Sequence, residues 1–226
     1  MIRTLDLFDL RHTLAGALLG RFLHPWQVLP EIREIILALG ETLEDGYSLE
    51  APGIWIHNTA SIAPSARLEG PCIIGPETQV RHCALLRGCV LLGAGCVVGN
   101  STEVKNSLFL DGAKAPHFNY VGDSILGHHA HLGAGAIVSN VKSDKSPVTV
   151  RWGCGSIATG LKKCGAFVGD GAEVGCGSVL NPGTLLGRES SVYPLSSVRG
   201  MVPERCILKQ GSLIIPKSPE NPAREG

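Results

Sequence analysis

Four histidines lie close together near the middle of the sequence. They are His117, His128, His129 and His131. An imidazole titrates near neutral pH, so a histidine in the right surroundings can accept a proton from an attacking amine. Histidines that converge can instead hold a metal ion, although His128 and His129 are neighbours and cannot both point inward from a strand. A third interpretation is a polar turn that takes part in no chemistry. The elements that position these side chains determine which of the three interpretations applies.

The strongest pattern in the chain is an aliphatic residue at every sixth position. The aliphatic positions are Ile56, Ile62, Leu68, Ile74, Val80, Leu86, Leu92, Val98, Val104 and Leu110, then Leu126, Leu132 and Val138, then Val168, Val174, Leu180, Leu186, Val192 and Val198. Four residues after most of them stands a small or β-branched residue, for example Ala60 or Ala136. A period of six fits neither a helix nor a simple alternation, and it is typical of the hexapeptide repeat of a parallel β-helix.

In a β-helix of this kind each hexad forms one short strand and a corner, and three hexads make a triangular coil. The coils stack at a strand spacing of about 4.8 Å. The aliphatic residue points inward, and the small residue fits the crowded corner, where a large side chain would overpack. We therefore expect an all-β protein with a parallel β-helix over residues 53–202.

Residues 1–52 lack the repeat and are expected to form a short helical extension. Apolar residues at helical spacing between Pro30 and Gly40 predict one helix, and the amphipathic segment 7–23 predicts a second. We expect them to cap the first coil or to pack on a neighbouring subunit, because an uncovered β-helix end exposes strand edges. The repeat is lost after residue 202, which predicts a C-terminal tail over 203–226.

Two interruptions of the repeat predict loop insertions, at about residues 111–125 and 141–166. Loops on a rigid scaffold carry function disproportionately often. His117 falls inside the first interruption, and the other three clustered histidines follow it. We therefore expect the chemistry to lie near these breaks.

Composition excludes several classes of function. The 20 basic and 20 acidic residues give no net charge, which argues against binding nucleic acid through bulk charge. The sequence has no run of 18 apolar residues, and Asp6 and Asp9 interrupt the apolar N-terminal stretch, so neither a transmembrane helix nor an export signal is expected. The eight cysteines form no C-x-x-C pair and are typical of reduced thiols. These features favour a cytoplasmic protein without nucleic-acid or membrane partners.

Three blocks of sequence resemble known enzymes. Residues 115–140, APHFNYVGDSILGHHAHLGAGAIVSN, resemble the H-x-x-Y-x-G-D…G-A-G-x-x-x-x-N signature of the acetyltransferase domain of the bifunctional N-acetylglucosamine-1-phosphate uridyltransferase (glucosamine-1-phosphate acetyltransferase) family. Residues 85–107, LLRGCVLLGAGCVVGNSTEVKNS, are similar to its L-R-x-G…G-N-x-x-E-x-K block. Residues 158–187, ATGLKKCGAFVGDGAEVGCGSVLNPGTLLG, resemble the β-helix domain of sugar-1-phosphate nucleotidylyltransferases. Together the resemblance spans about residues 55 to 200 and implies a left-handed β-helix that assembles as a homotrimer.

The resemblance also implies an activity, the transfer of an acetyl group from acetyl-CoA to the amine of an amino-sugar 1-phosphate or a related nucleotide sugar. On matching positions, His117 would be the base that deprotonates the sugar amine. Glu103 would be the acid that orients this histidine, a partner that favours the imidazolium formed during catalysis. Arg87 and Lys105 would hold the sugar phosphate through charge-assisted hydrogen bonds.

Further positions complete the expected site. The resemblance places Tyr120 and Asn140 against the amino sugar, and His131 stands where the family usually has an asparagine that contacts the substrate. This departure leaves the identity of the amino sugar open. CoA is expected in a groove beside the coils. The candidate residues for its binding are Ala134, where the family's backbone meets acetyl-CoA, and Arg199, Arg205 and Lys209 for its phosphates.

Two other functions stay open. Nothing in the 226 residues corresponds to the nucleotidyltransferase domain of the bifunctional enzymes, so uridyltransferase or pyrophosphorylase activity is not expected. The β-helix could then serve as a non-catalytic oligomerisation or regulatory partner of a separate sugar nucleotidyltransferase. The third function is a metal site like that of the hexapeptide-repeat carbonic anhydrases, which hold zinc with three histidines, two of them spaced H-x-x-x-x-H. The sequence has no such pair, so we assign no metal ligand, but a site across a subunit interface remains open.

Overall fold

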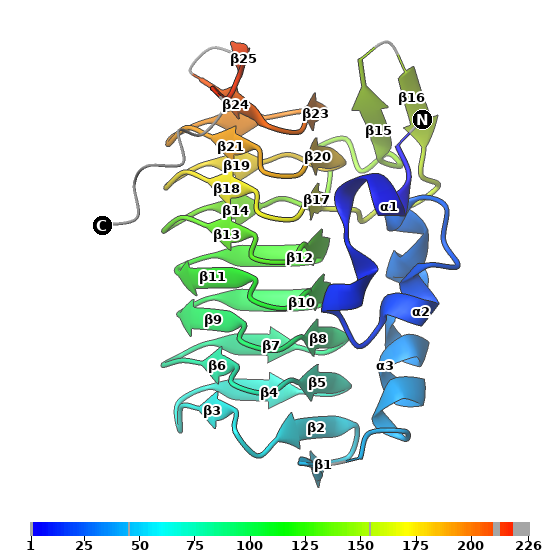
Figure 1. The fold of residues 1–226 in the computed structure, drawn as a ribbon, viewed down its shortest axis with the longest axis vertical. Coiled ribbons are helices and arrows are strands. Elements are labelled where there is room, and N and C mark those ends of the chain that lie inside the picture. The colour runs from blue at the N-terminus through cyan, green and yellow to red at the C-terminus, as the bar shows by residue number, and fades with distance from the viewer. Residues whose placement is uncertain (1, 45, 154, 210–212, 219–226) are drawn as a thin grey trace.

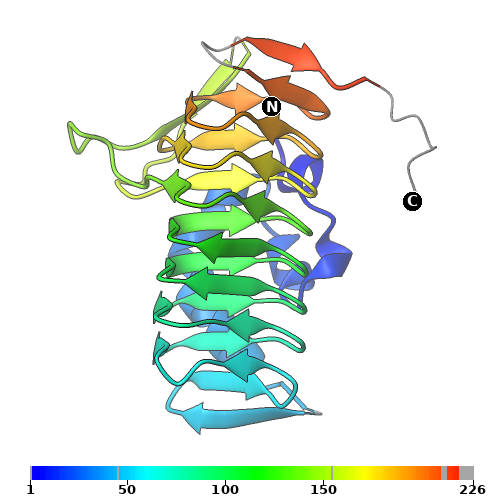
Figure 2. The same ribbon diagram turned by 90° about the vertical axis from the view of Figure 1, so that its left-hand side faces the viewer.

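The computed structural model describes residues 2–44, 46–153, 155–209 and 213–218. Most of these residues form a left-handed parallel β-helix, which confirms the predicted fold. Short parallel strands stack coil upon coil along the long axis of the molecule, and the chain turns a corner between one strand and the next (Figures 1 and 2). The stacked strands make three faces of a prism.

Each face is a ladder of parallel strands. The first face contains β2 (Ile54–His57), β5 (Cys72–Ile74), β8 (Val90–Leu92), β17 (Ala166–Val168), β20 (Thr184–Leu186) and β23 (Met201–Val202). The second face contains β3 (Ser61–Ile62), β6 (Gln79–Val80), β9 (Val97–Asn100), β11 (Lys114–His117), β13 (His131–Leu132), β18 (Glu173–Val174), β21 (Ser191–Val192) and β24 (Cys206–Leu208). The third face contains β4 (Arg67–Glu69), β7 (Leu85–Arg87), β14 (Ile137–Val138), β19 (Val179–Leu180) and β22 (Ser197–Val198). Two longer strands, β10 (Glu103–Phe109) and β12 (Tyr120–Leu126), run from the third face onto the first.

The interior of the prism is built from the aliphatic repeat. Predicted inward residues such as Ile74, Leu86 and Val104 are fully buried there. Small residues at the corners, for example Ala84 and Ala130, are buried beside them. The repeat therefore specifies both the inward face of each strand and the tight packing at each corner.

The first predicted insertion, at residues 111–125, was wrong, because this segment forms β11, a corner and most of β12. The repeat slips here because the coils become shorter. Cys72 pairs with Val90, 18 residues later, whereas Ser107 pairs with Ser124, 17 residues later. The missing residue comes from the corner between the third and first faces. As a result Phe109, rather than the predicted Leu110, enters the interior beside Leu92.

The helices of the N-terminal extension lie along the side of the prism and do not cap its end (Figure 1). They are α1 (Thr4–Leu7), η1 (Leu10–His12), α2 (Gly16–Leu19), η2 (Pro25–Glu31) and α3 (Ile32–Gly40). The predicted helix up to Gly40 is present as α3, but the segment 7–23 is broken into short pieces and is not one helix. Outward residues of the first face, among them Ile73, Leu91 and Phe167, are fully buried beneath these helices. That second apolar cluster fixes the helices in place.

Three further elements complete the chain. β1 (Tyr47–Ala51), in a region predicted as helical extension, pairs antiparallel with β2 at the first coil. The second interruption contains a hairpin of β15 (Thr149–Trp152) and β16 (Gly155–Ala158), which stands beside the solenoid (Figure 1). The predicted tail contributes to β24, which extends the stack, and to β25 (Ile214–Pro216), which pairs antiparallel with β24. Its last residues, 219–226, lie outside the described residues.

Candidate active site

The corner between the second and third faces carries His117. Backbone hydrogen bonds stack this corner coil on coil, from Phe118 to Asn100 (2.8 Å) and from Gly135 to His117 (2.9 Å). Ala134 therefore lies directly beside His117 in the next coil. The two residues to which the sequence assigns the base and a cofactor contact share one edge of the prism.

A buried asparagine holds the His117 corner in shape. The side chain of Asn119 accepts a hydrogen bond from the backbone N–H of His117 (3.1 Å) and donates to the carbonyl groups of Gly133 and Ala136. The backbone of Phe118 is left-handed, with φ of 52°. Asn119 was not singled out from the sequence, although asparagine is a residue type whose side chain often bonds nearby backbone groups in turns. The His117 ring is exposed, and within the described part of the chain it has no hydrogen-bond partner.

Beside this corner, Arg87 and Glu103 form an ion pair across the third face. The Arg87 Nη1 atom lies 2.6 Å from Glu103 Oε1, and this hydrogen bond raises the pKa of the guanidinium. In the single chain the Glu103 carboxylate therefore contacts Arg87, and among the described residues no hydrogen bond joins it to His117. Lys105 follows on the same strand, two residues from Glu103 and on the same side of it.

Tyr120 pairs in register with Glu103 on the neighbouring strand. Burial raises the pKa of its hydroxyl, and the charges of Asp123 and Glu103 act in the same direction. The Tyr120 hydroxyl and the Asn140 amide both approach Gly122, where a Cβ atom would lie 2.6 Å from the former and 2.7 Å from the latter. Glycine at this position therefore opens the space that these two predicted sugar contacts occupy.

The far edge of the third face carries a buried polar ladder. Asp123 accepts a hydrogen bond from the Asn106 amide (2.8 Å) and another from the Asn140 amide (2.5 Å). These three residues occupy the corner where the coils are shortest, and Asn106 and Asp123 both have left-handed backbone, with φ of 45° and 49°. The ladder fixes the Asn140 side chain next to Tyr120. Asn106 and Asp123 were missed from the sequence, where nothing marks them as a pair.

His131 lies on the second face, away from Tyr120 and Asn140. Its Nδ1 atom is 2.8 Å from a carboxylate oxygen of Glu173, and its backbone pairs with Lys114. Within one chain this predicted substrate contact is therefore separated from the other residues assigned to the sugar.

The three cations proposed for the CoA phosphates do not come together. Arg199 follows β22 at the end of the third face and lines a pocket with Lys142 and Arg151. Arg205 lies 3.5 Å from Glu189 at the corner between the first and second faces. Lys209 follows β24 and lies over the Tyr193 ring. Of the three, Arg199 is the one that shares a face with the predicted catalytic residues.

Of the remaining clustered histidines, His128 contacts the N-terminal extension. The rings of His12 and His128 stack with centroids 3.8 Å apart, and His129 packs against His128 at 4.0 Å. Among the described residues, no three His, Cys, Asp or Glu side chains are arranged to hold a metal ion. The carbonic-anhydrase-like interpretation thus has no ligand set in the described part of a single chain.

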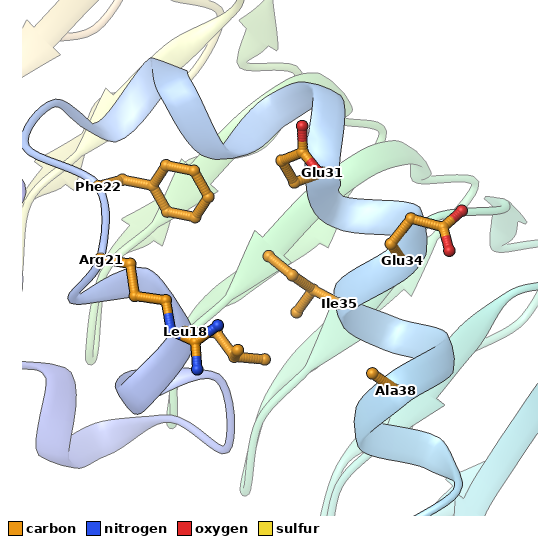
Figure 3. Close-up of a pocket in the computed structure, with 7 residues that line it drawn as sticks. All are labelled: Leu18, Arg21, Phe22, Glu31, Glu34, Ile35 and Ala38. Carbon is orange, nitrogen blue, oxygen red and sulfur yellow. The ribbon is translucent and has the colours of Figure 1, made fainter.

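A groove lies elsewhere, on the helical layer. It has a volume of about 460 Å³ and is bounded by Leu18 and Phe22 on one side and by Ile35 and Ala38 on the other (Figure 3). None of the residues assigned to catalysis or substrate binding lines it.

Comparison with known proteins finds the same kinds of enzyme that the sequence motifs resemble. A family described as the GMPPB C-terminal domain matches residues 68–154. A bifunctional sugar-1-phosphate nucleotidylyltransferase/acetyltransferase of Sulfurisphaera tokodaii is 32% identical over 120 residues, 53% of this chain and 28% of that protein. The bifunctional protein GlmU of Methanococcus maripaludis is 32% identical over 199 residues, 86% of this chain and 48% of that protein. These matches confirm the resemblance.

The chain thus spans between about a quarter and a half of the length of these relatives. Among solved structures, the acetyltransferase domain of PglB from Neisseria gonorrhoeae FA1090 aligns over 84% of this chain and 66% of that one, at 13% identity and a TM-score of 0.40. One structure of that domain was obtained in complex with acetyl coenzyme A. Within the described residues of this protein, no helix combines the length and the apolar character needed to cross a membrane.

Proposed function

We propose that this protein transfers an acetyl group from acetyl-CoA to the amine of an amino-sugar 1-phosphate or of a nucleotide-linked amino sugar. The observation that carries the proposal is the shared edge of the prism, where the His117–Ala134 corner adjoins the Arg87–Glu103 pair. All four residues fall within residues 68–154, the stretch matched by the GMPPB C-terminal domain family. Acetyl transfer to the amine of a sugar phosphate requires an imidazole, an acid and a cation, and this edge has all three beside an open backbone position.

The reaction forms one bond and breaks another. The sugar amine attacks the thioester carbonyl carbon, a C–N bond forms, and the C–S bond breaks. His117 accepts the proton that the amine loses and returns it to the departing CoA thiolate. An imidazole exposed at this edge can take up the proton, and general base catalysis of this kind contributes roughly a hundredfold to ten-thousandfold in rate.

The Arg87–Glu103 pair links substrate binding to the base. A sugar phosphate offers Arg87 a second anionic partner, because two phosphate oxygens can accept two parallel hydrogen bonds from one guanidinium. When Arg87 turns toward the phosphate, the Glu103 carboxylate is released to stabilise an imidazolium at His117. Lys105 on the same strand adds a second positive charge for the phosphate. Tyr120 and Asn140 then border the sugar ring.

A matched pair of histidine variants tests the proposal. His82 occupies the same corner as His117 two coils earlier, and both rings are exposed. In an assay of CoA thiol release with acetyl-CoA and a panel of amino-sugar phosphates, we expect His117→Ala to lower kcat by at least about 100-fold and His82→Ala to leave it unchanged. Equal rates for wild type and His117→Ala would remove His117 from the mechanism.

We further propose that the active unit is a homotrimer in which a neighbouring chain completes the site. The support is that His131 lies on the second face and that the ring of His117, at the edge between two faces, has no hydrogen-bond partner among the described residues. Sedimentation equilibrium should give three times the chain mass of 23.8 kDa. A monomer that is fully active would show that one chain suffices.

A second candidate is a non-catalytic partner of a separate sugar nucleotidyltransferase. The engagement of Glu103 by Arg87 favours it, because the predicted acid–base pair is not assembled within one chain. In that case no amino sugar gives turnover, and a nucleotidyltransferase co-purifies with the protein. Turnover that depends on His117 would exclude this candidate.

A further inference from the structure

The second interruption of the repeat builds a pocket away from the residues assigned to catalysis. The pocket has a volume of about 160 Å³ and lies between the inserted segment and the solenoid. Its lining residues are Lys142, Thr149 and Arg151 from the insertion, and Pro182, Arg199 and Gly200 from the solenoid. The β15–β16 hairpin therefore forms one wall, and the end of the third face forms the other.

The hairpin is held firmly at this place. Val148 and Val150 are fully buried in the cluster beneath the helices, so the alternation of the strand directs Thr149 and Arg151 to the opposite side. At Gly183, with φ of 78°, a Cβ atom would lie 2.9 Å from the Val148 side chain. Glycine is therefore required where the insertion crosses the solenoid. The position of Arg151 follows from buried contacts.

The pocket carries three positive charges and no carboxylate among its lining residues. Lys142 lies 3.5 Å from Asp144, whose side chain is largely exposed. Arg151 and Arg199 take part in no ion pair in the described part of the chain. Cations gathered in a concave site produce a positive potential that attracts an anion. Two guanidinium groups offer paired N–H donors that match the oxygens of a phosphate group.

The pocket also lies in line with the candidate active site. Val121, Val138, Leu180 and Val198 pair in register down the third face, so the residues that follow them stack in one column. That column runs from Gly122, beside Tyr120, to Arg199. Three strand spacings separate its ends, or about 14 Å. A ligand anchored at Arg199 by its phosphates would reach Tyr120 only through a long arm.

We propose that Lys142, Arg151 and Arg199 form a binding site for the diphosphate group of an extended ligand. Two ligands carry this chemistry, CoA and a nucleotide-linked sugar. The site itself does not depend on acetyl transfer, whereas its use by either ligand rests on the proposed function. The inserted hairpin thus serves to bind the end of a ligand remote from the reacting atoms.

Calorimetric titration of the full chain with inorganic diphosphate, CoA and UDP tests the site. We expect Arg151→Ala and Arg199→Ala to weaken diphosphate binding at least about tenfold each, the effect of losing a charged hydrogen-bond donor. Arg33→Ala, an exposed arginine on α3, is the matched control and should bind as wild type does. Unchanged affinity of all three probes for both pocket variants, with folding verified by thermal melting, would overturn the proposal.

The same titrations distinguish the two ligands and separate this site from the proposed reaction. A loss confined to CoA assigns the site to the acetyl donor, and a loss confined to UDP assigns it to a nucleotide-linked acceptor. His117→Ala should bind all three probes as wild type does. If the pocket variants lose binding while wild type shows no acetyl transfer, the site stands and the proposed function fails. If the pocket variants bind all three probes as tightly as wild type does and wild type transfers the acetyl group, the proposed function stands and the diphosphate site fails.

Discussion

The guanidinium of Arg87 lies 2.6 Å from the carboxylate of Glu103, across the neighbouring strands β7 and β10. Both side chains are partly exposed, so the pair itself contributes little to stability. Its importance is that each partner has another proposed role, Arg87 toward a phosphate and Glu103 toward His117. On the proposed function, the pair keeps both groups oriented until a phosphate competes for the arginine.

We predict that Arg87→Ala raises KM for a phosphorylated acceptor by at least about tenfold, because a charge-assisted hydrogen bond to the phosphate is lost. The melting temperature should not change measurably. Arg33→Ala is the matched control, since Arg33 is exposed on α3, which packs on the first face. Steady-state kinetics with both variants makes the comparison. A KM shared by Arg87→Ala and wild type would show that Arg87 serves Glu103 alone.

A second prediction concerns the buried ladder at the far edge of the same face. Asp123→Ala leaves the buried Asn140 amide without this acceptor and leaves the Asn106 amide with the Leu29 carbonyl (3.2 Å), and we expect a loss of about 2–4 kcal/mol in the free energy of unfolding. Urea unfolding measures it. Asp144→Ala, on the exposed part of the insertion, should stay within about 0.5 kcal/mol of wild type. Equal losses for the two variants would contradict the role given to the ladder.

The sequence repeat predicts the β-helix because each inward position demands the same residue type in every coil. It cannot predict where a coil loses one residue. The corners at Asn106 and Asp123 are one residue shorter than the earlier corners, and the aliphatic spacing changes there by one position. The break at 111–125 therefore looks like a loop in the sequence, although the chain there forms the regular strands β11 and β12. His117, Tyr120 and Glu103 are nevertheless brought to one edge, because positions in adjacent coils stack whatever their exact length.

The placement of the helices was harder to predict. Outward residues such as Ile73, Leu91 and Leu108 stand next to inward aliphatics, and a run of apolar residues does not reveal which side a second layer covers. The hairpin in the second interruption was likewise not predicted, so Arg151 was not connected with Arg199. Long-range contacts between an insertion and the solenoid leave no periodic signal in the sequence.

The attachment of the helices gives a third prediction. Phe167 is fully buried and its ring meets the edge of Trp26, with centroids 6.2 Å apart. Phe167→Ala should cost about 3–5 kcal/mol in the free energy of unfolding, the usual loss for removing a buried aromatic ring. Phe118→Ala is the control, because that ring is 61% exposed and should change stability by less than about 0.5 kcal/mol. Urea unfolding and hydrogen exchange in α3 compare the two. A small loss for Phe167→Ala would mean that the helices are not packed on the first face.

The contact between the N-terminal extension and the β-helix should also depend on pH. His129 packs against His128, which stacks on His12 from η1. Burial lowers the pKa of His129 below its ordinary value of 6.5, and the charges of His128, Lys114 and His12 lower it further, while Asp111 opposes them. Because the folded state then binds fewer protons than the unfolded state, stability falls as the pH drops through 6.5 and levels off below the lowered pKa.

Since the ring is largely exposed, the fall in melting temperature between pH 7.5 and 5.5 should be small but reproducible. His129→Asn, which tolerates the left-handed backbone at this position, should flatten this part of the profile, whereas His82→Asn at a distant corner should leave it as in wild type. Thermal melts at half-unit pH intervals provide the measurement. A profile that keeps its slope in His129→Asn would place the pH dependence in another group.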